Sequence, residues 1–155
     1  MKRDRRLRQL SDDHHQALVL ARRATSAASA ESEAAVVAWE EVVRRFHREL
    51  APHFSVEEQY MLPALERAGC GALAKRTRDE HTELSRLVSE DRHDVATRLD
   101  RFGSLLRAHV RFEERVLFEA AQEKLSNAEL DAVNEACRAE TSSSHPRTGA
   151  NNHDR

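Results

Sequence analysis

Two stretches of this sequence place a glutamate four residues after a histidine. His53 precedes Glu57, and His109 precedes Glu113. Residues four apart lie on the same face of an α-helix about one turn from each other, so each pair offers an imidazole and a carboxylate to the same partner. A pair of this kind on each of two helices is typical of a metal site inside a helical bundle.

Helical periodicity accounts for the surroundings of both pairs. Apolar residues at steps of three and four predict one helix over residues 7–28, with His14 in its apolar stripe, and a second that ends near Gly69. The stripe of the second helix reads Val36, Trp39, Val43, Phe46, Leu50, His53, Glu57, Tyr60 and Ala64. Pro52 and Pro63 lie within this run, and each removes a backbone donor, so we expect a kink or break near them.

Two more long helices follow the same rule. The third is predicted over residues 73–90, with His81 in place of a core residue, and the fourth over residues 94–124. The stripe of the fourth helix reads Val95, Leu99, Phe102, Leu106, His109, Glu113, Val116 and Ala120. In both helices the imidazole therefore faces the predicted core.

Length and composition favour an all-α fold. The chain has 155 residues with only four glycines and three prolines, which suits one helical domain. We predict an up-down-up-down four-helix bundle, followed by a short C-terminal helix that begins with a capping box at Ser126 and Glu129. Residues 1–140 are expected to form this single domain, and residues 141–155 a disordered polar tail.

Charge and hydropathy exclude several function classes. The 25 basic and 27 acidic residues are dispersed along the chain and sum to a net charge of −2, which argues against nucleic acid as a partner. No apolar run is long enough for a signal peptide or a membrane span, so we expect a cytoplasmic protein without membrane contact. Cys70 and Cys137 lack the close spacing of a thiolate metal site.

The polar residues in the four apolar stripes form one candidate site. They are His14, His53, Glu57, His81, His109 and Glu113. Buried carboxylates and imidazoles without partners are costly, and two divalent cations would remove that cost. This donor mix suits two iron ions, and also manganese or zinc, with each glutamate able to bridge the pair. Because ligand imidazoles must be neutral, metal should be lost as the pH falls below the imidazole pKa.

Alternatives exist for individual positions and for the whole set. His15 competes with His14, but its helix face is polar, and Glu114 competes with Glu113 as the bridging carboxylate. Glu58 and Glu114 lie one position off the stripes, which favours solvated or supporting positions. A buried hydrogen-bond network without metal is the alternative for the set as a whole.

The sequence resembles the hemerythrin-like (HHE) cation-binding domains in four segments. These are residues 10–14, which read Leu-Ser-Asp-Asp-His, residues 53–57, the pair Glu80 and His81, and residues 109–113. The resemblance covers about residues 7–124. It implies a four-helix bundle with a carboxylate-bridged non-haem di-iron centre that meets dioxygen or related small oxidants.

One histidine of the oxygen-carrying hemerythrins is missing here. Those proteins have a second histidine one turn before that of helix three, and this chain has Thr77 there and Ser85 one turn after His81. Tyr60 is an alternative ligand for the vacancy. The shorter ligand set implies peroxide handling, a nitric oxide response or sensing rather than simple oxygen storage. Peroxide- or nitric oxide-consuming enzyme activity and a non-catalytic module for iron storage, sensing or donation both remain open.

Overall fold

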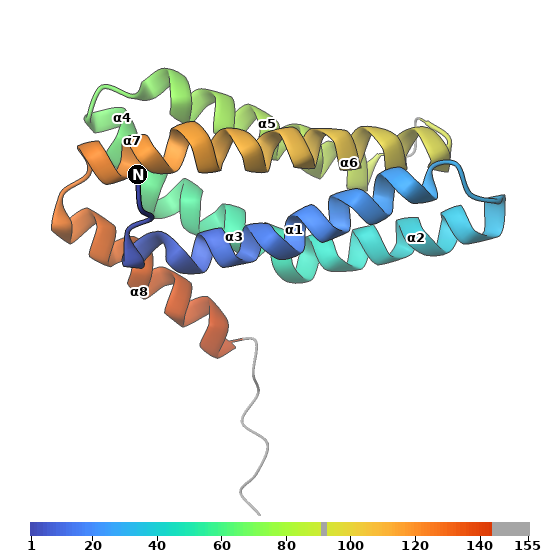
Figure 1. The fold of residues 1–155 in the computed structure, drawn as a ribbon, viewed down its shortest axis with the longest axis horizontal. Coiled ribbons are helices and arrows are strands. Elements are labelled where there is room, and N and C mark those ends of the chain that lie inside the picture. Colours follow the sequence, from blue (N-terminus) through green and yellow to red (C-terminus); the bar gives the residue numbers. More distant parts are fainter. Residues whose placement is uncertain (91–92, 144–155) are drawn as a thin grey trace, which may run out of the picture.

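The computed structural model describes residues 1–90 and 93–143, and these residues form helices without any strand. The predicted all-α class is therefore confirmed. Five continuous helical rods make up the fold (Figure 1). The first rod is the short turn η1 (Arg5–Leu7) with α1 (Arg8–Ala27), and the second joins α2 (Ser32–Arg45), η2 (Phe46–Leu50), α3 (Ala51–Val56), η3 (Glu57–Met61) and α4 (Leu62–Arg67). The others are α5 (Gly71–Ser89), then α6 (Val95–Phe112) with η4 (Glu113–Leu117) and α7 (Phe118–Lys124), and finally α8 (Asn127–Ser143).

The rods end where local chemistry favours an end. Gly69 adopts a φ of 87° after α4, a conformation that costs glycine little. The predicted capping box is present before α8, because the N–H of Glu129 donates to Ser126 Oγ at 3.1 Å and the N–H of Ser126 donates to the Glu129 carboxylate at 2.9 Å. Helix α8 continues past the predicted start of the tail to Ser143, and the rest of that tail, residues 144–155, lies outside the described residues.

The second rod is continuous through both of its prolines, so the predicted break does not occur. A π-helical turn precedes each proline instead: η2 ends at Leu50, before Pro52, and η3 ends at Met61, before Pro63. A proline ring clashes with the carbonyl four residues earlier in a regular α-helix, and a wider turn relieves that contact.

The π-turns η3 and η4 also shift the buried face by one residue. The predicted stripes continue from Glu57 to Tyr60 and from Glu113 to Val116, but both of these side chains are 43% exposed. Met61 and Leu117 are buried in their place, at 0% exposure. A π-turn bonds each residue to the fifth one along, so it takes one more residue to return to the same face.

The core consists of two apolar clusters. One joins the start of α1 to α4, α7 and α8 and includes Leu10, Met61 and Phe118. The other joins α1, α2 and α6 and includes Leu20 and Phe102. On each rod that contains them, the predicted histidines and glutamates lie between residues of one apolar cluster and residues of the other. A polar layer therefore separates the two clusters.

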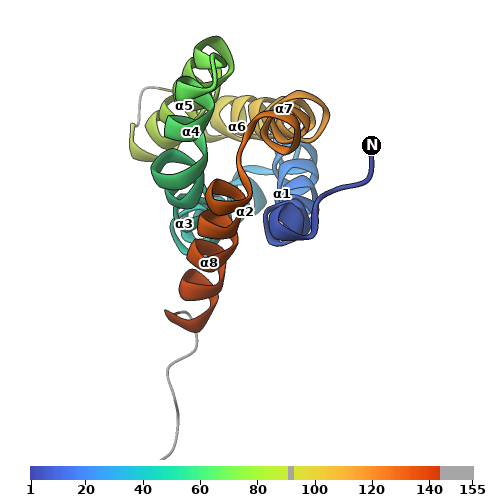
Figure 2. The same ribbon diagram turned by 90° about the vertical axis from the view of Figure 1, so that its left-hand side faces the viewer.

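Helices α1 and α6 pack closely along their length, and Gly103 permits the approach. A Cβ at this position would lie 2.6 Å from the carbonyl oxygen of Ala21 and 2.6 Å from Cγ2 of Thr25. Helix α8 packs against α3, η3 and η1, over one end of the other rods (Figures 1 and 2). Among the described residues, none of these helices combines the length and apolar character needed to cross a membrane.

Candidate metal centre

The structure brings all six predicted site residues together in the polar layer. His14 comes from α1, His53 and Glu57 from α3 and the start of η3, His81 from α5, and His109 and Glu113 from α6 and the start of η4. Every one of these side chains is buried, and both glutamates are completely buried. His15, the competitor of His14, is exposed.

The six residues form two overlapping groups of four. One group contains His14 and His53, the other contains His81 and His109, and both contain Glu57 and Glu113. Within each group the potential ligand atoms lie within 4.8 Å of one another, a spacing that a single coordinated ion would span. Glu57 and Glu113 therefore lie where carboxylates that bridge two ions would lie.

Short distances link the imidazoles to these two carboxylates. In the first group, Nε2 of His14 is 2.8 Å from Glu113 Oε2, and Nε2 of His53 is 3.1 Å from Glu57 Oε1. In the second group, Nε2 of His81 is 3.1 Å from Glu57 Oε2, and Nε2 of His109 is 2.9 Å from Glu113 Oε1. Each glutamate thus uses one oxygen toward each group.

The residues fit a pair of metal ions because their inward-facing atoms lack hydrogen bonds. The four Nε2 atoms and both carboxylate oxygens of Glu57 and Glu113 are buried and make no hydrogen bond, although they lie close to one another. Buried polar atoms in proteins almost always have a hydrogen-bond partner. A whole set of buried polar atoms without one points to a common ligand. Nitrogen and oxygen donors arranged around two shared carboxylates suit divalent metals, which would satisfy all of these atoms at once.

Four further carboxylates, here called the outer carboxylates, hold the other nitrogen of each imidazole. Nδ1 of His14 donates to Glu114 at 2.7 Å, and Nδ1 of His53 donates to Asp13 at 2.9 Å. Nδ1 of His81 donates to Glu58 at 3.0 Å. An ionised carboxylate only accepts, so each of these bonds fixes the proton on Nδ1 and leaves Nε2 free for a metal.

The fourth outer carboxylate is Glu80, which lies 3.3 Å from Nδ1 of His109. Sequence reasoning quoted Asp13 and Glu80 only as parts of motifs and gave neither a role. Each directly precedes a site histidine in the sequence, yet each binds a histidine of a different helix. Spacing along one helix could not have identified these pairs, because they depend on how two helices lie against each other.

Glu114 supports the site from outside. Its carboxylate binds His14 Nδ1 and also accepts a hydrogen bond from Arg3 at 2.8 Å, while Glu113 takes the inward position. Arg3 donates as well to the backbone carbonyl of Glu114 at 2.7 Å. Glu113 thus belongs to both groups of potential ligand atoms, whereas Glu114 lies outside them and contacts His14 from the other side.

The electrostatics of the site follow from these contacts. Burial alone would lower the pKa of His81, but the carboxylates of Glu113, Glu57 and Glu58 outweigh it and raise that pKa to about 11. The pKa of His109 rises to about 9, because the charge of Glu113 outweighs the effect of burial. The metal-free site therefore holds protons on its imidazoles, and metal ions must displace them.

Of the three residues considered for the position of the missing histidine of helix α5, none points a polar group into the site. Thr77 is buried, but its hydroxyl donates to the backbone carbonyl of Leu73 at 2.9 Å, within its own helix. Ser85 is exposed, and the π-turn carries Tyr60 to the surface, so the prediction that Tyr60 could fill the vacancy is wrong. Each group of four thus offers two imidazoles and two shared carboxylates.

Comparison with known proteins agrees with this geometry. The family model of the hemerythrin HHE cation-binding domain matches residues 5–121. The chain belongs to the hemerythrin HHE family. The match includes all six residues of the site and the four outer carboxylates, and it ends before α8. No curated protein and no solved structure matches the chain. Helix α8 thus lies outside the matched region.

Proposed function

We propose that this HHE protein binds two iron ions and uses them to bind or react with dioxygen, peroxide or nitric oxide, in the response to oxidative or nitrosative stress or in sensing. His14 and His53 would hold one ion, His81 and His109 the other, and Glu57 and Glu113 would bridge them. The observation that carries the proposal is the set of buried, unsatisfied ligand atoms around two shared carboxylates.

The donor set favours iron among the candidate metals. It contains imidazole and carboxylate without thiolate, which suits iron and is also compatible with manganese or zinc. The outer carboxylates add negative charge near every imidazole, and negative charge stabilises the higher oxidation state of a bound ion. Bound iron would supply the redox chemistry, and the chain's own residues would position it.

Incomplete coordination supports a reaction with small molecules. Each ion would receive four protein ligands, fewer than the six that iron commonly accepts, and Thr77 does not add a fifth. A small cavity of about 10 Å³ lies beside His14, His53 and His109. This volume corresponds to about one water-sized molecule. A small molecule bound at an open position of an ion could extend into this space.

The arrangement of the rods is part of the proposal. We infer that the four rods before α8 form the up-down-up-down four-helix bundle expected of the family, and that residues 1–140 fold as one domain. In such a bundle each rod presents one face to a common core, which is consistent with ligands from all four rods in one layer.

Iron content and absorption test the proposal directly. Protein purified aerobically after iron supplementation should contain about two iron ions per chain and absorb in the near ultraviolet through ligand-to-metal charge transfer. A colourless protein with less than about half an iron per chain would refute it. If the protein instead contained two manganese or two zinc ions per chain, the metal site would be supported and the iron chemistry would be refuted.

A second measurement separates reaction from iron storage or sensing. Iron-loaded protein should consume peroxide or bind nitric oxide, and Glu57→Ala and Glu113→Ala variants should lose this behaviour together with their iron. If the loaded protein is inert toward all three small molecules, the alternative of an iron storage, sensing or donation module is favoured.

A further inference from the structure

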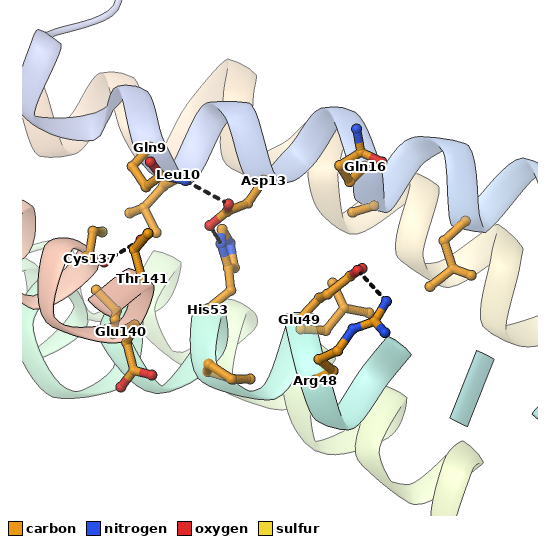
Figure 3. Close-up of a pocket in the computed structure, with 15 residues that line it drawn as sticks. Gln9, Leu10, Asp13, Gln16, Arg48, Glu49, His53, Cys137, Glu140 and Thr141 are labelled. Atoms are coloured by element: carbon orange, nitrogen blue, oxygen red, sulfur yellow. Dashed lines mark hydrogen bonds and ion pairs between the residues drawn. The ribbon is translucent and has the colours of Figure 1, made fainter. Parts of the chain in front are cut away.

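A surface pocket of about 310 Å³ lies between α1, the η2 and α3 segments, and α8 (Figure 3). We call it the entrance pocket. Its volume falls at the lower end of the range of small-molecule pockets in proteins. Its apolar wall consists of Leu10, Ala17, Leu20, Leu50, Pro52 and Val56.

The floor of the entrance pocket is part of the metal centre. Asp13 and His53 point toward each other there and are joined at 2.9 Å (Figure 3). Asp13 also accepts a hydrogen bond from Gln9 at 3.0 Å, which keeps its carboxylate in this position. His53 is therefore the site histidine whose outer face borders this pocket.

The small cavity beside the imidazoles, here called the inner cavity, lies next to this floor and shares lining residues with it. It is lined by His14, His53 and His109 and by the apolar side chains of Phe54, Leu106 and Val110. The entrance pocket and the inner cavity share the lining residues Asp13, Ala17, Leu50 and His53. These four residues form the wall between solvent and the site.

A second surface pocket approaches the site from the other side, but it has less in common with the inner cavity. It borders His81 and its outer carboxylate Glu58, and Ser85 lies at its surface. Phe54 is the one residue that this pocket and the inner cavity share. The Phe54 ring stacks on His81 with centroids 3.8 Å apart, and it is the side chain that separates this pocket from the inner cavity.

Charge around the entrance pocket favours neutral molecules. Its lining carries three carboxylates, those of Asp13, Glu49 and Glu140, and one guanidinium, that of Arg48. An anion would meet this negative lining, and any ion would lose hydration in the apolar inner cavity. A neutral molecule of a few atoms meets neither cost.

We infer that the entrance pocket is the path by which a neutral molecule of a few atoms reaches the metal centre, and that Ala17 and Leu50 set the size that can pass. The inference rests on the proposed function, since it concerns access to the same site. Helix α8 contributes Cys137, Glu140 and Thr141 to the pocket and lies beyond the matched HHE region. Access would therefore depend on a part of this chain outside the family core.

Nitric oxide binding to the reduced, iron-loaded protein tests the inference. Iron per chain is measured first, and nitric oxide is then mixed with wild-type and variant proteins in a stopped-flow instrument without oxygen. Ala17→Val narrows the shared wall and should slow association by about tenfold, while Leu50→Ala opens the wall and should speed it severalfold. Both changes should leave the iron content near that of the wild type.

Ser85→Val is the matched control, because it introduces the same valine side chain as Ala17→Val, but into the lining of the second pocket. It should leave the association rate unchanged. Thr141→Trp, at the exposed rim on α8, should also slow association and serves if Ala17→Val does not fold. Normal iron content with unchanged rates in Ala17→Val or Thr141→Trp would overturn the inference, as would slower binding in Ser85→Val. Absence of iron in the wild type would instead refute the proposed function.

Discussion

The two halves of the candidate metal centre have the same donors but different surroundings. The first half contains His14 and His53, the second contains His81 and His109, and they share Glu57 and Glu113. Arg3 and α8, both outside the matched family region, lie over the first half, whereas the second half is enclosed by Phe54 and its outer carboxylates. Identical donors would make two ions equivalent, so any difference between them must come from these surroundings.

Removal of a shared carboxylate should abolish both halves together. Glu113→Ala takes one oxygen from each group of four and leaves Glu57 as the one carboxylate that the two groups share. We expect iron to fall from about two per chain to below about half an ion per chain, because both sites depend on it. Elemental analysis after iron loading measures this. Glu123→Ala, an exposed position on α7, is the control and should retain full iron.

Removal of one histidine should abolish metal binding in its own half of the site and leave the other half occupied. His53→Ala is expected to lose the first ion and His81→Ala the second, so each variant should hold about one iron per chain. His47→Ala, at an exposed position, should keep both. If either ligand variant lost both ions, the two sites would bind metal only as a coupled pair, and the division into halves would not describe the protein.

The metal-free protein should become less stable as the pH rises. His81 and His109 have pKa values of about 11 and 9 in the fold, above the value near 6.5 of an unfolded chain. Their contribution to stability is therefore fully present below about pH 6.5 and is lost as the pH rises through about 9 and then 11. A loss on the order of a few kcal/mol is expected between pH 7 and pH 11.

Urea denaturation at a series of pH values measures this loss in the metal-free protein. Iron-loaded protein should show a much smaller change over the same range, since metal replaces the protons. A metal-free stability that stayed constant or rose between pH 7 and pH 11 would contradict the charge balance described for the site.

The outer carboxylates should tune metal affinity half by half. Glu58→Gln keeps the shape of the side chain but removes the charge beside His81, and Glu114→Gln does the same beside His14. Each should weaken iron binding by about 10- to 100-fold, mainly at its own half. Competition with a chelator gives the affinities. An equal loss at both ions in each variant would show that the outer charges act on the pair as a whole.

Arg3→Ala should have the smallest effect and should affect the first half alone. Arg3 binds the Glu114 carboxylate at 2.8 Å, and Glu114 holds His14. Loss of a partly exposed ion pair is worth about 1 kcal/mol or less, so we expect a change of a few-fold in affinity for one ion. In the Glu114→Gln background the same substitution should add little, because the ion pair is already lost.

The sequence was sufficient to predict that the six candidate residues are buried close together, because a polar residue in an apolar stripe is a mismatch that a buried partner explains. Spacing predicted His14, His53 and His81 correctly as inward-facing residues, and it preferred Glu113 to Glu114. It could not predict the outer carboxylates. Asp13 is next to His14 in the sequence but binds His53 from another helix, and such a contact depends on how the helices cross.

Which residues after Glu57 and Glu113 face the core could not be predicted either. A periodic stripe assumes a regular α-helix, and the π-turns after Glu57 and Glu113 break that assumption. Tyr60 and Val116 were therefore expected inside and lie outside. Pro63 gives a reason for a distortion in η3, but residues 118–145 after η4 contain no proline, so the sequence has no comparable local signal for the second π-turn.

The two π-turns η3 and η4 occupy equivalent positions in the two helix pairs of the chain. Each begins at a glutamate four residues after a site histidine, η3 after His53 and η4 after His109. The supporting contacts correspond as well: an acid directly before a histidine on the first rod of each half, and a second acid directly after each bridging glutamate. Residues 5–67 and 71–124 thus repeat one pattern of ligands, supports and wide turns. The two helix pairs therefore contribute equivalent residues to one buried layer, as the two parts of an approximate internal repeat.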